Sequence, residues 1–377
     1  MFQRLKTAII RSAYALFRLF PIRSDRVLLF SYYGEQYSGS PKYIGRYLTE
    51  KKEFDVVWAF VEPSQYANLS AKTVRYGHLG YYFMLATAKT IITNYRMTED
   101  FIKRKGQTYI QTWHSSLRLK MIEKDTEDTL PPHYVSMAKK DSTQIDYLLA
   151  GSQKSREIFE RAFWYDGKIV NTGTPQCDIL FGDCAEIRRK VTAHFGLPED
   201  AHIALYAPTF RKNHDTSVYD LDTEALLESL KDRFGGDWYL LMRLHPHLVN
   251  LTGCFNYSEH VLQATGYDDA QELLAAADVL ISDYSAIMFD FSVTRRLCLL
   301  YTPDFETYTT TDRHLYFDIR QLPFPNFESK SELETYIRNV DMEQYRRGVD
   351  QFIDSIGCFD DGNACKRVYD LIGGLNK

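Results

Sequence analysis

Cysteine is scarce in this chain, and its spacing narrows the class of protein. The 377 residues contain 6 cysteines, and no two of them form a C-x-x-C pair. Small disulfide-bonded domains and zinc ribbons need denser or paired cysteines. We therefore expect reduced cysteine side chains, a cytoplasmic protein and no bound metal.

Several motifs of phosphate and nucleophile chemistry are also missing. The sequence has no G-x-x-x-x-G-K-[ST] loop, no G-x-G-x-x-G fingerprint and no G-x-S-x-G elbow. These absences argue against P-loop NTPases, fingerprint-type dinucleotide enzymes and α/β-hydrolases. The net charge of −5 provides no basic field for nucleic acid. A D-x-D spacing occurs at Asp220 and Asp222, but it lies at a predicted helix start, where aspartate favours capping over metal binding.

No uninterrupted apolar run reaches transmembrane length, yet residues 1–25 differ from the rest of the chain. Their apolar and basic side chains fall largely on different faces of a predicted helix. Such a helix can lie in an anionic membrane surface or pack on its own domain, and the sequence leaves both interpretations open. The apolar face comprises Phe2, Leu5, Ile9, Ala13, Leu16, Phe17 and Phe20, and the basic residues are Arg4, Lys6, Arg11 and Arg18.

Short apolar runs alternate with helical patterns along the rest of the chain. This alternation predicts an α/β protein whose parallel sheets are covered on both faces. The runs form two series, so we predict two Rossmann-like domains, 26–181 and 200–377, joined by a polar connection at about 182–200. The predicted strands are 26–31, 55–61, 90–94, 109–113, 147–150 and 169–172, and then 203–206, 238–242, 261–263, 279–281 and 297–301.

Polar side chains follow several of these predicted strands. Doubly wound domains bind ligands at the carboxyl ends of their strands, where histidine can move a proton and arginine can bind phosphate. Each residue alone is more often structural, but their placement at strand ends favours a functional site. They are His114 after the strand 109–113, Thr209 and Arg211 after 203–206, and Arg243 and His245 after 238–242.

The stretch 277–294 combines a strand, a polar turn and the start of a helix. The turn holds Ser282, Asp283 and Ser285, and apolar residues then resume at helical spacing. Backbone N–H groups at a helix start can bind phosphate. The alternative is that Ser282 or Asp283 only caps the helix, and the turn taken alone favours this alternative.

Four segments in order resemble the CDP-glycerol glycerophosphotransferase family. They are Q-T-W-H (Gln111–His114), Y-A-P-T-F-R (Tyr206–Arg211), R-L-H-P (Arg243–Pro246) and S-D-Y-S-A-I-M-F-D-F (Ser282–Phe291). The resemblance implies a GT-B architecture, in which two Rossmann-like domains face a central cleft. It also implies transfer of glycerol phosphate from CDP-glycerol to a hydroxyl of a membrane-linked acceptor, with release of CMP, during synthesis of teichoic acid or a related polymer. These enzymes act peripherally at the cytoplasmic face of the cell membrane.

The resemblance also implies roles for single residues and no cofactor. His114 is the expected general base, and His245 and Ser285 are expected to hold the donor diphosphate. The loop after His114 should face the lipid-linked or glycan acceptor, but it reads Ser-Ser-Leu-Arg-Leu-Lys where the family commonly has Gly-Thr-Pro-Leu-Lys. The expected sets are therefore His114 and His245 for catalysis, Thr209, Arg211, Arg243, Ser282, Asp283, Ser285 and Asp290 for the donor, and Ser115, Ser116 and Lys120 for the acceptor.

Three other functions fit the same pattern. A CDP-ribitol enzyme would share these motifs, and a panel of donors separates the two. A GT-B sugar transferase or UDP-sugar epimerase would release UDP rather than CMP. A nucleotide-binding scaffold would bind a CDP-alcohol without turnover. The sequence leaves the acceptor and the oligomeric state open.

Overall fold

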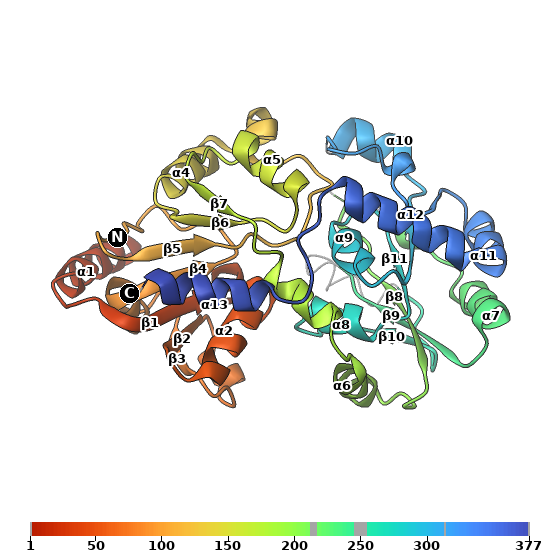
Figure 1. The fold of residues 1–377 in the computed structure, drawn as a ribbon, viewed down its shortest axis with the longest axis horizontal. Helices are drawn as coiled ribbons and strands as arrows, with labels where there is room; N and C mark the ends of the chain where they lie inside the picture. The colour runs from red at the N-terminus through yellow and green to blue at the C-terminus, as the bar shows by residue number, and fades with distance from the viewer. Residues whose placement is uncertain (1, 212–216, 245–254, 313, 376–377) are drawn as a thin grey trace. The chain divides into compact units, whose positions relative to one another are not determined.

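A computed structural model describes residues 2–211, 217–244, 255–312 and 314–375 (Figure 1). The chain forms two compact units. The first comprises residues 1–114, 122–178 and 359–377, and the second comprises 115–121 and 179–358. Each unit contains one sheet whose strands all pair in parallel, which confirms the predicted α/β class with two Rossmann-like sheets.

The sheet of the first unit has 7 strands in the order β3-β2-β1-β4-β5-β6-β7. Since the chain reverses its direction of strand addition between β1 and β4, their carboxyl ends form the topological switch point of this sheet. β1 ends in the buried apolar run Val27–Phe30, and β4 is buried except at Lys89, as expected for a parallel sheet covered on both faces. The strands are β1 (Arg23–Phe30), β2 (Asp55–Phe60), β3 (Lys72–Arg75), β4 (Ala88–Thr93), β5 (Thr108–Gln111), β6 (Tyr147–Leu149) and β7 (Lys168–Val170).

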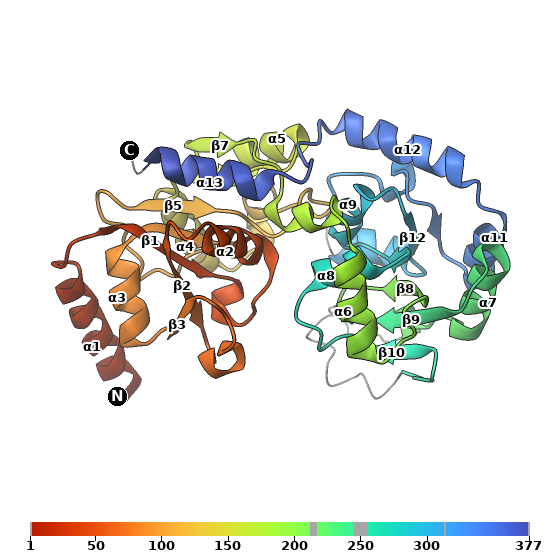
Figure 2. The same cartoon turned by 60° about the horizontal axis from the view of Figure 1, so that its bottom comes forward.

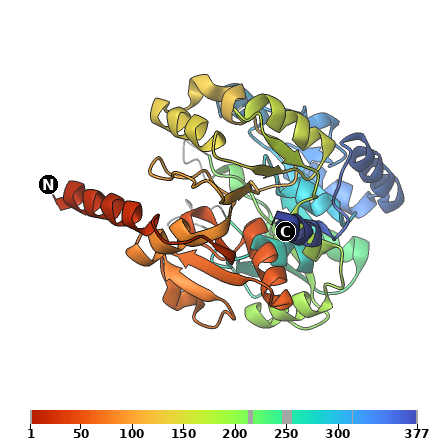
Figure 3. The same ribbon diagram turned by 60° about the vertical axis from the view of Figure 1, so that its left-hand side comes forward.

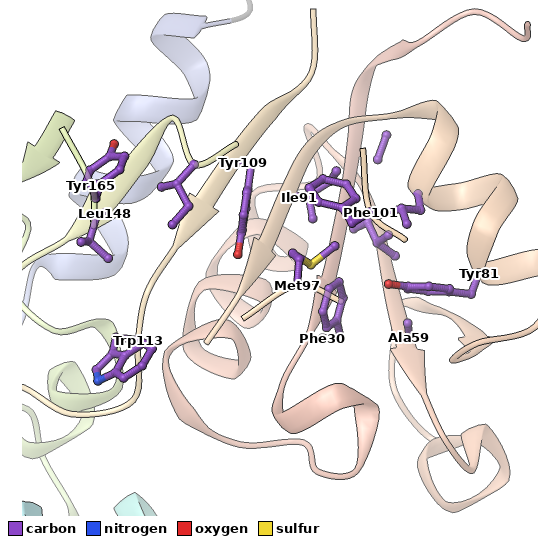
Figure 4. Packing of buried hydrophobic residues seen from close by; sticks show 14 of the residues in the cluster. Phe30, Ala59, Tyr81, Ile91, Met97, Phe101, Tyr109, Trp113, Leu148 and Tyr165 are labelled. Atoms are coloured by element: carbon purple, nitrogen blue, oxygen red, sulfur yellow. The ribbon is translucent and has the colours of Figure 1, made fainter. Parts of the chain in front are cut away.

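A large apolar core lies against this sheet. Phe30, Ile91, Tyr109 and Leu148 come from different strands and are almost completely buried, and Figure 4 shows them in one cluster with Trp113 at one end. The helices of this unit are α1 (Phe2–Phe17), α2 (Gly39–Lys51), α3 (Leu79–Thr87), α4 (Pro132–Ser142), α5 (Gln153–Ala162) and α13 (Ala364–Leu375).

The sheet of the second unit has 6 strands in the order β10-β9-β8-β11-β12-β13. Its switch point lies between β8 and β11. The strands are β8 (His202–Tyr206), β9 (Trp238–Met242), β10 (Val261–Gln263), β11 (Val279–Ser282), β12 (Leu297–Tyr301) and β13 (Asn326–Phe327). The helices are α6 (Ala185–Phe195), α7 (Thr223–Phe234), α8 (Ala270–Ala276), α9 (Ile287–Ser292), α10 (Phe305–Thr307), α11 (Lys330–Asn339) and α12 (Met342–Ser355).

The predicted strands are all present within a few residues of their predicted ends, but three features were not predicted. β3 and β13 are short edge strands of 4 and 2 residues, too short to leave an apolar run in the sequence. The polar stretch 182–200 is not a plain connection, because it contains the 11-residue helix α6. Arg188 of that helix pairs with Asp278 at 2.8 Å and with the carbonyl of Ala201, which places a polar face against the protein.

The C-terminal end of the chain also differs from the predicted division at 200–377. Residues 359–377 group with the first unit. Asp178 accepts hydrogen bonds from the backbone N–H groups of Ala364 and Cys365 at 2.9 and 2.7 Å, which caps the start of α13. The same helix lies beside α2 (Figure 1), and Tyr369 packs on Tyr47 with ring centroids 5.7 Å apart. Sequence order alone could not reveal this return of the chain.

Candidate active site

The switch point of the second sheet gathers several of the predicted donor residues. Asp283, directly after β11, accepts hydrogen bonds from the backbone N–H of Thr209 at 2.8 Å and from the Thr209 hydroxyl at 3.1 Å. Arg211 donates to the same carboxylate at 2.8 Å. The hydroxyl of Ser282 donates to the carbonyl of Ala207 at 2.7 Å. The loop after β8 and the turn after β11 are therefore held together by side chains.

Arg211 is the centre of this group. Its Nε donates to Asp304 at 2.6 Å, and its guanidinium lies 4.9 Å from the ring centroids of both Tyr284 and Tyr308. These two rings stack with centroids 3.7 Å apart. Burial by itself lowers the pKa of Arg211, but the charges of Asp283 and Asp304 outweigh burial and raise it. A permanently charged guanidinium therefore fixes both loops from inside the protein.

Only the second half of the turn after β11 is accessible to solvent. Ser282 and Asp283 are buried, whereas Ser285, Ala286 and Ile287 are half-buried. The following helix α9 has only 6 residues, so its dipole is weaker than a long helix would provide. The Ser285 hydroxyl accepts a long hydrogen bond of 3.4 Å from the backbone N–H of Ile287. Ser285 is thus the most exposed of the three predicted donor residues in this turn.

Two other predicted donor residues take part in protein contacts. Arg243 follows β9, and its guanidinium donates to the backbone carbonyls of Ala264 and Tyr267, beyond the end of β10.

Asp290 is 2 % exposed, and it accepts from the backbone N–H and the hydroxyl of Ser116 at 2.9 and 2.6 Å. Gln271 donates to its other oxygen at 2.7 Å. The structure therefore gives both residues a role in holding loops, and donor binding by them stays a prediction.

The predicted acceptor loop belongs to the second unit by its contacts. Residues 115–121 group with that unit, although the sequence placed them in the first domain. The hydrogen bonds from Ser116 to Asp290 are one reason, and an antiparallel bridge between Lys120 and Leu315 is another. The carbonyl of Ser115 accepts from Arg118 at 2.6 Å, and the Lys120 ammonium lies 5.5 Å from the Tyr308 ring centroid. The chain passes from one unit to the other directly after His114.

His114 itself follows β5 in the first unit. The predicted strand 109–113 ends earlier, at Gln111, because Trp113 adopts a left-handed backbone with φ of 54°. This conformation is costly for a bulky residue and is concentrated at functional sites. The half-buried His114 ring lies 4.4 Å from the Trp113 ring and 5.7 Å from the Tyr95 ring.

Gln111 holds this turn, a role that was not predicted from the sequence. Its side-chain oxygen accepts from the backbone N–H of Trp113 at 2.9 Å. Its side-chain nitrogen donates to the Tyr95 carbonyl at 2.8 Å and to the Tyr109 hydroxyl at 2.9 Å. Gln111 is completely buried, so these hydrogen bonds replace the ones that its amide group would make with water. Its place in the Q-T-W-H motif was the only signal in the sequence.

A buried ion cluster lies behind the turn and was not predicted. Arg96 donates to Glu123 at 2.8 Å and to Asp141 at 3.2 Å, and its guanidinium lies 5.9 Å from the Trp113 ring centroid. Burial raises the pKa of Asp141 to about 6, although Arg96 opposes the shift. These charged residues are far apart in the sequence, so no local pattern could have joined them.

The remaining predictions have mixed outcomes. His245 lies outside the described residues. Asp222 caps α7 by accepting from the backbone N–H of Ala225 at 3.1 Å, which confirms the capping interpretation for this residue. Asp220 pairs with Lys330 at 2.6 Å. Within the described part of the chain, no group of His, Cys, Asp and Glu side chains is arranged to hold a metal ion. None of the described helices combines the length and apolar character needed to cross a membrane.

Two doubly wound domains in one chain are typical of a GT-B-like architecture. Residues 12–374 match the family described as CDP-Glycerol:Poly(glycerophosphate) glycerophosphotransferase. The chain therefore belongs to this family of glycerophosphotransferases, as the four motifs suggested.

Individual relatives agree with this assignment. The chain is 30% identical over 368 residues to a teichoic acid poly(glycerol phosphate) polymerase of Staphylococcus epidermidis, covering 93% of this chain and 51% of that protein. It is 28% identical to a protein of the same description from Bacillus spizizenii, covering 98% of both. A solved structure of a variant of the wall teichoic acid polymerase TagF, soaked with CDPG, has a TM-score of 0.86 at 28% identity. That match covers 100% of this chain and 96% of the other, which confirms the fold.

Proposed function

We propose that this protein transfers glycerol phosphate from CDP-glycerol to a hydroxyl of a membrane-linked acceptor in the synthesis of teichoic acid or a related polymer. The single observation that carries the proposal is the family match over residues 12–374. The CDPG-soaked TagF variant, similar over the whole chain, supports CDP-glycerol as the donor.

The proposed reaction gives each unit a separate task. His114 takes the proton from the acceptor hydroxyl, and the resulting oxygen attacks the β-phosphorus of CDP-glycerol. The bond between that phosphorus and the bridging oxygen breaks, and CMP leaves. A histidine can accept a proton near neutral pH, and a positioned base of this kind accelerates a reaction by about 10²–10⁴-fold.

The second unit is the proposed donor side. The Arg211–Asp283–Thr209 contacts fix the switch-point loops, and the half-buried Ser285 lies on the accessible part of the turn. Phosphoryl transfer depends mainly on positioning and on stabilising negative charge, so a rigid turn with a free surface suits this role. His245 remains the residue predicted from the sequence to hold the diphosphate.

The test of this function is a donor panel with the full chain. Purified protein is incubated with CDP-glycerol, CDP-ribitol or a UDP-sugar, together with lipid-linked acceptors, and nucleotide release is followed. We expect CMP release that depends on both CDP-glycerol and acceptor. Preference for CDP-ribitol would support a CDP-ribitol enzyme, and release of UDP would support a sugar transferase. Binding of the CDP-alcohol without turnover would indicate a nucleotide-binding scaffold.

We also propose that the protein lies on an anionic membrane surface through the end of α1. Helix α1 packs on α3, as Figure 2 shows, and extends outward from the sheet in Figure 3. Tyr14 is buried in the core, and Phe17 packs edge-on against Phe83 at 5.4 Å. At the same end of the helix, Leu16 and Leu19 are nevertheless 58% and 79% exposed. Both open interpretations of the helix are thus supported: it packs on its own domain and still presents apolar side chains.

Vesicle binding tests the membrane proposal. Because Tyr14 belongs to the core, deleting residues 1–20 would disturb the fold. The sharper variant is L16S with L19S, and V61S is a control at an exposed apolar position elsewhere in the first unit. Co-sedimentation with anionic vesicles should fall for the double variant and for wild type at high salt, and it should not change for the control. Equal binding by all three proteins would place the contact elsewhere.

A further inference from the structure

The amide of Gln111 has one orientation, because its partners in the turn before His114 determine it. The backbone N–H of Trp113 donates to the side-chain oxygen at 2.9 Å, and the carbonyl of Tyr95 accepts from the side-chain nitrogen at 2.8 Å. Only one orientation of the amide satisfies both a donor and an acceptor. The second hydrogen of the same nitrogen is donated to the Tyr109 hydroxyl at 2.9 Å.

The Tyr109 hydroxyl extends these contacts toward a buried carboxylate. Because it accepts from Gln111, its own hydrogen is left to donate elsewhere. Tyr109 is completely buried, Asp141 is 2 % exposed, and the hydroxyl interacts with this carboxylate. Arg96 donates to one oxygen of Asp141 at 3.2 Å, and within the described residues the other oxygen makes no hydrogen bond of normal geometry. Asp141, Tyr109 and Gln111 thus form a buried polar relay that ends at the turn before His114.

Asp141 can change its charge within the range in which enzymes work. Burial raises its pKa to about 6, whereas the charge of Arg96 and the Tyr109 hydroxyl oppose the shift. Arg96 is shared with Glu123, which it contacts at 2.8 Å. The charged and titratable groups that act on Asp141 directly or through Arg96 are Arg96 after β4, Tyr109 of β5, Glu123, Tyr134 of α4 and Tyr33 after β1.

We propose that Asp141 and Tyr109 are positioning residues of the reaction. They hold the Gln111 amide, which fixes the turn that carries His114. Trp113 in this turn has φ of 54°, a strained conformation that persists only when its surroundings hold it. An ionised Asp141 accepts the Tyr109 hydrogen and leaves the Tyr109 oxygen to Gln111. A protonated Asp141 is itself a donor, so it competes with Gln111 for that oxygen. This inference rests on the proposed role of His114 as the base.

Rates of CMP release by the full chain test the two positioning residues. Y109F removes the hydroxyl, and D141N leaves a neutral side chain in place of the carboxylate. Each variant should lower kcat by about 5–50-fold at about pH 8, because the base is misplaced. The Kd for CDP-glycerol should stay within about twofold of wild type, because the relay belongs to the first unit. A wild-type kcat in both variants would overturn the proposal.

Matched controls lie at the amino edge of the same sheet. The buried Tyr165 hydroxyl donates to the carbonyls of Asp146 and Lys168 at 3.0 and 3.1 Å, and Asp55 pairs with Arg26 at 3.0 Å. Y165F and D55N therefore remove comparable contacts at the edge opposite the turn, and kcat should stay within about twofold of wild type. Equal losses of kcat in the controls and in the relay variants would show general damage and contradict positioning.

The pH dependence of kcat separates positioning from a purely structural role. Because D141N resembles the protonated state of Asp141, the wild-type and D141N rates should converge as pH falls through about 6. Y109F should converge with wild type in the same way, since it interrupts the relay at every pH. Rates that differ by a constant factor across the whole range would mean that Asp141 acts on the fold alone.

Nuclear magnetic resonance tests the relay without turnover. The sequence has 4 tryptophans, so isotope-labelled tryptophan gives few backbone N–H signals, and W113F identifies the signal of Trp113. The comparison uses H114A and H114A with D141N, because H114A removes the titration of the imidazole. The Trp113 signal should shift as pH passes about 6 in the former protein and should not shift in the latter.

The two readouts distinguish failure of the relay from failure of the proposed function. A Trp113 signal that does not titrate in H114A, or that titrates equally in both proteins, would refute the relay even when CMP is released from CDP-glycerol. If wild type releases no CMP, the proposed function fails, and the Trp113 titration alone still decides whether Asp141 controls this turn.

Discussion

The two switch points of this protein are built from opposite kinds of side chain. Between β1 and β4 the protein places half-buried aromatic rings beside His114, on a backbone that bends through left-handed residues. Between β8 and β11 it places charged groups that pair with one another, with Arg211 bonded to both Asp283 and Asp304. Both edges occupy the same position in the same kind of sheet, so the fold alone does not determine their chemistry.

The difference shows how each edge is made rigid. In the second unit, ion pairs and hydrogen bonds fix the loops from within, and the accessible surface is the turn at Ser285. In the first unit, the rigid part is the amide of Gln111 and the buried Arg96 cluster, and the accessible surface is aromatic. The sequence motifs predict the phosphate-rich donor at the former edge and the acceptor hydroxyl at the latter.

The largest expected effect is on turnover at His114. H114A should lower kcat by about 10²–10⁴-fold, because the acceptor hydroxyl loses its general base. Steady-state CMP release measures it. H133A is the matched control, since His133 is exposed on α4, and it should keep the wild-type rate. Wild-type turnover by H114A would make this histidine structural.

The next effect concerns the charged edge. R211A leaves the buried Asp283 and the half-buried Asp304 without their cation, so the free energy of unfolding should fall by about 3–5 kcal/mol and donor affinity should fall with it. R188A removes an ion pair with Asp278, which adjoins the start of β11, and serves as control. Denaturant unfolding and calorimetry with CDP-glycerol measure both quantities. Donor affinity that drops equally in both variants would show general damage rather than loss of a switch-point contact.

A smaller effect should separate positioning from stability in the first unit. Q111A removes the acceptor of the Trp113 N–H, so the strained turn relaxes and kcat should fall by about 10–100-fold with a changed pH–rate profile. Q107A is the control, because Gln107 is a buried glutamine that bonds to Leu85 and Ala88 at the other edge. A merely structural Gln111 would lower stability as Q107A does and leave the pH–rate profile unchanged.

The smallest effect is a pH dependence of stability. Burial raises the pKa of Asp141 to about 6 from 3.8, so the folded protein holds this proton more tightly than the unfolded chain. The resulting stabilisation is fully present below about pH 4 and is lost as pH rises through about 6. The free energy of unfolding of wild type minus that of D141N should therefore fall by about 1–3 kcal/mol across this window. A difference that rises with pH would mean that Arg96 lowers the pKa instead.

Sequence patterns predicted the sheets well because buried parallel strands leave continuous apolar runs. The runs at 203–206, 238–242 and 297–301 correspond to β8, β9 and β12. The strand before His114 was predicted two residues too long, because Thr112 and Trp113 are residue types that favour strands, whereas the backbone turns at Trp113. Periodicity reports burial, and it does not report the sign of φ.

The sequence predicted which residues belong to the candidate site better than it predicted how they contact one another. Thr209, Arg211 and Asp283 do meet, because the ends of neighbouring parallel strands share an edge. The second carboxylate on Arg211 is that of Asp304, 93 residues away in the sequence. The sequence therefore could not show that Arg211 pairs with two carboxylates. The placement of Ser116 on Asp290 spans 174 residues, and the contacts of Arg96 with Glu123 and Asp141 span 27 and 45 residues. Contacts of this kind follow from tertiary packing and leave no local pattern.

The most direct test of the division of labour is calorimetric titration of CDP-glycerol into full-length H114A, with wild type beside it. If the first unit supplies the base and the second unit binds the donor, the Kd of the variant will match wild type within about twofold while its CMP release is lost. A Kd that weakens by tenfold or more would place His114 on the donor and contradict the separation of roles between the two switch points.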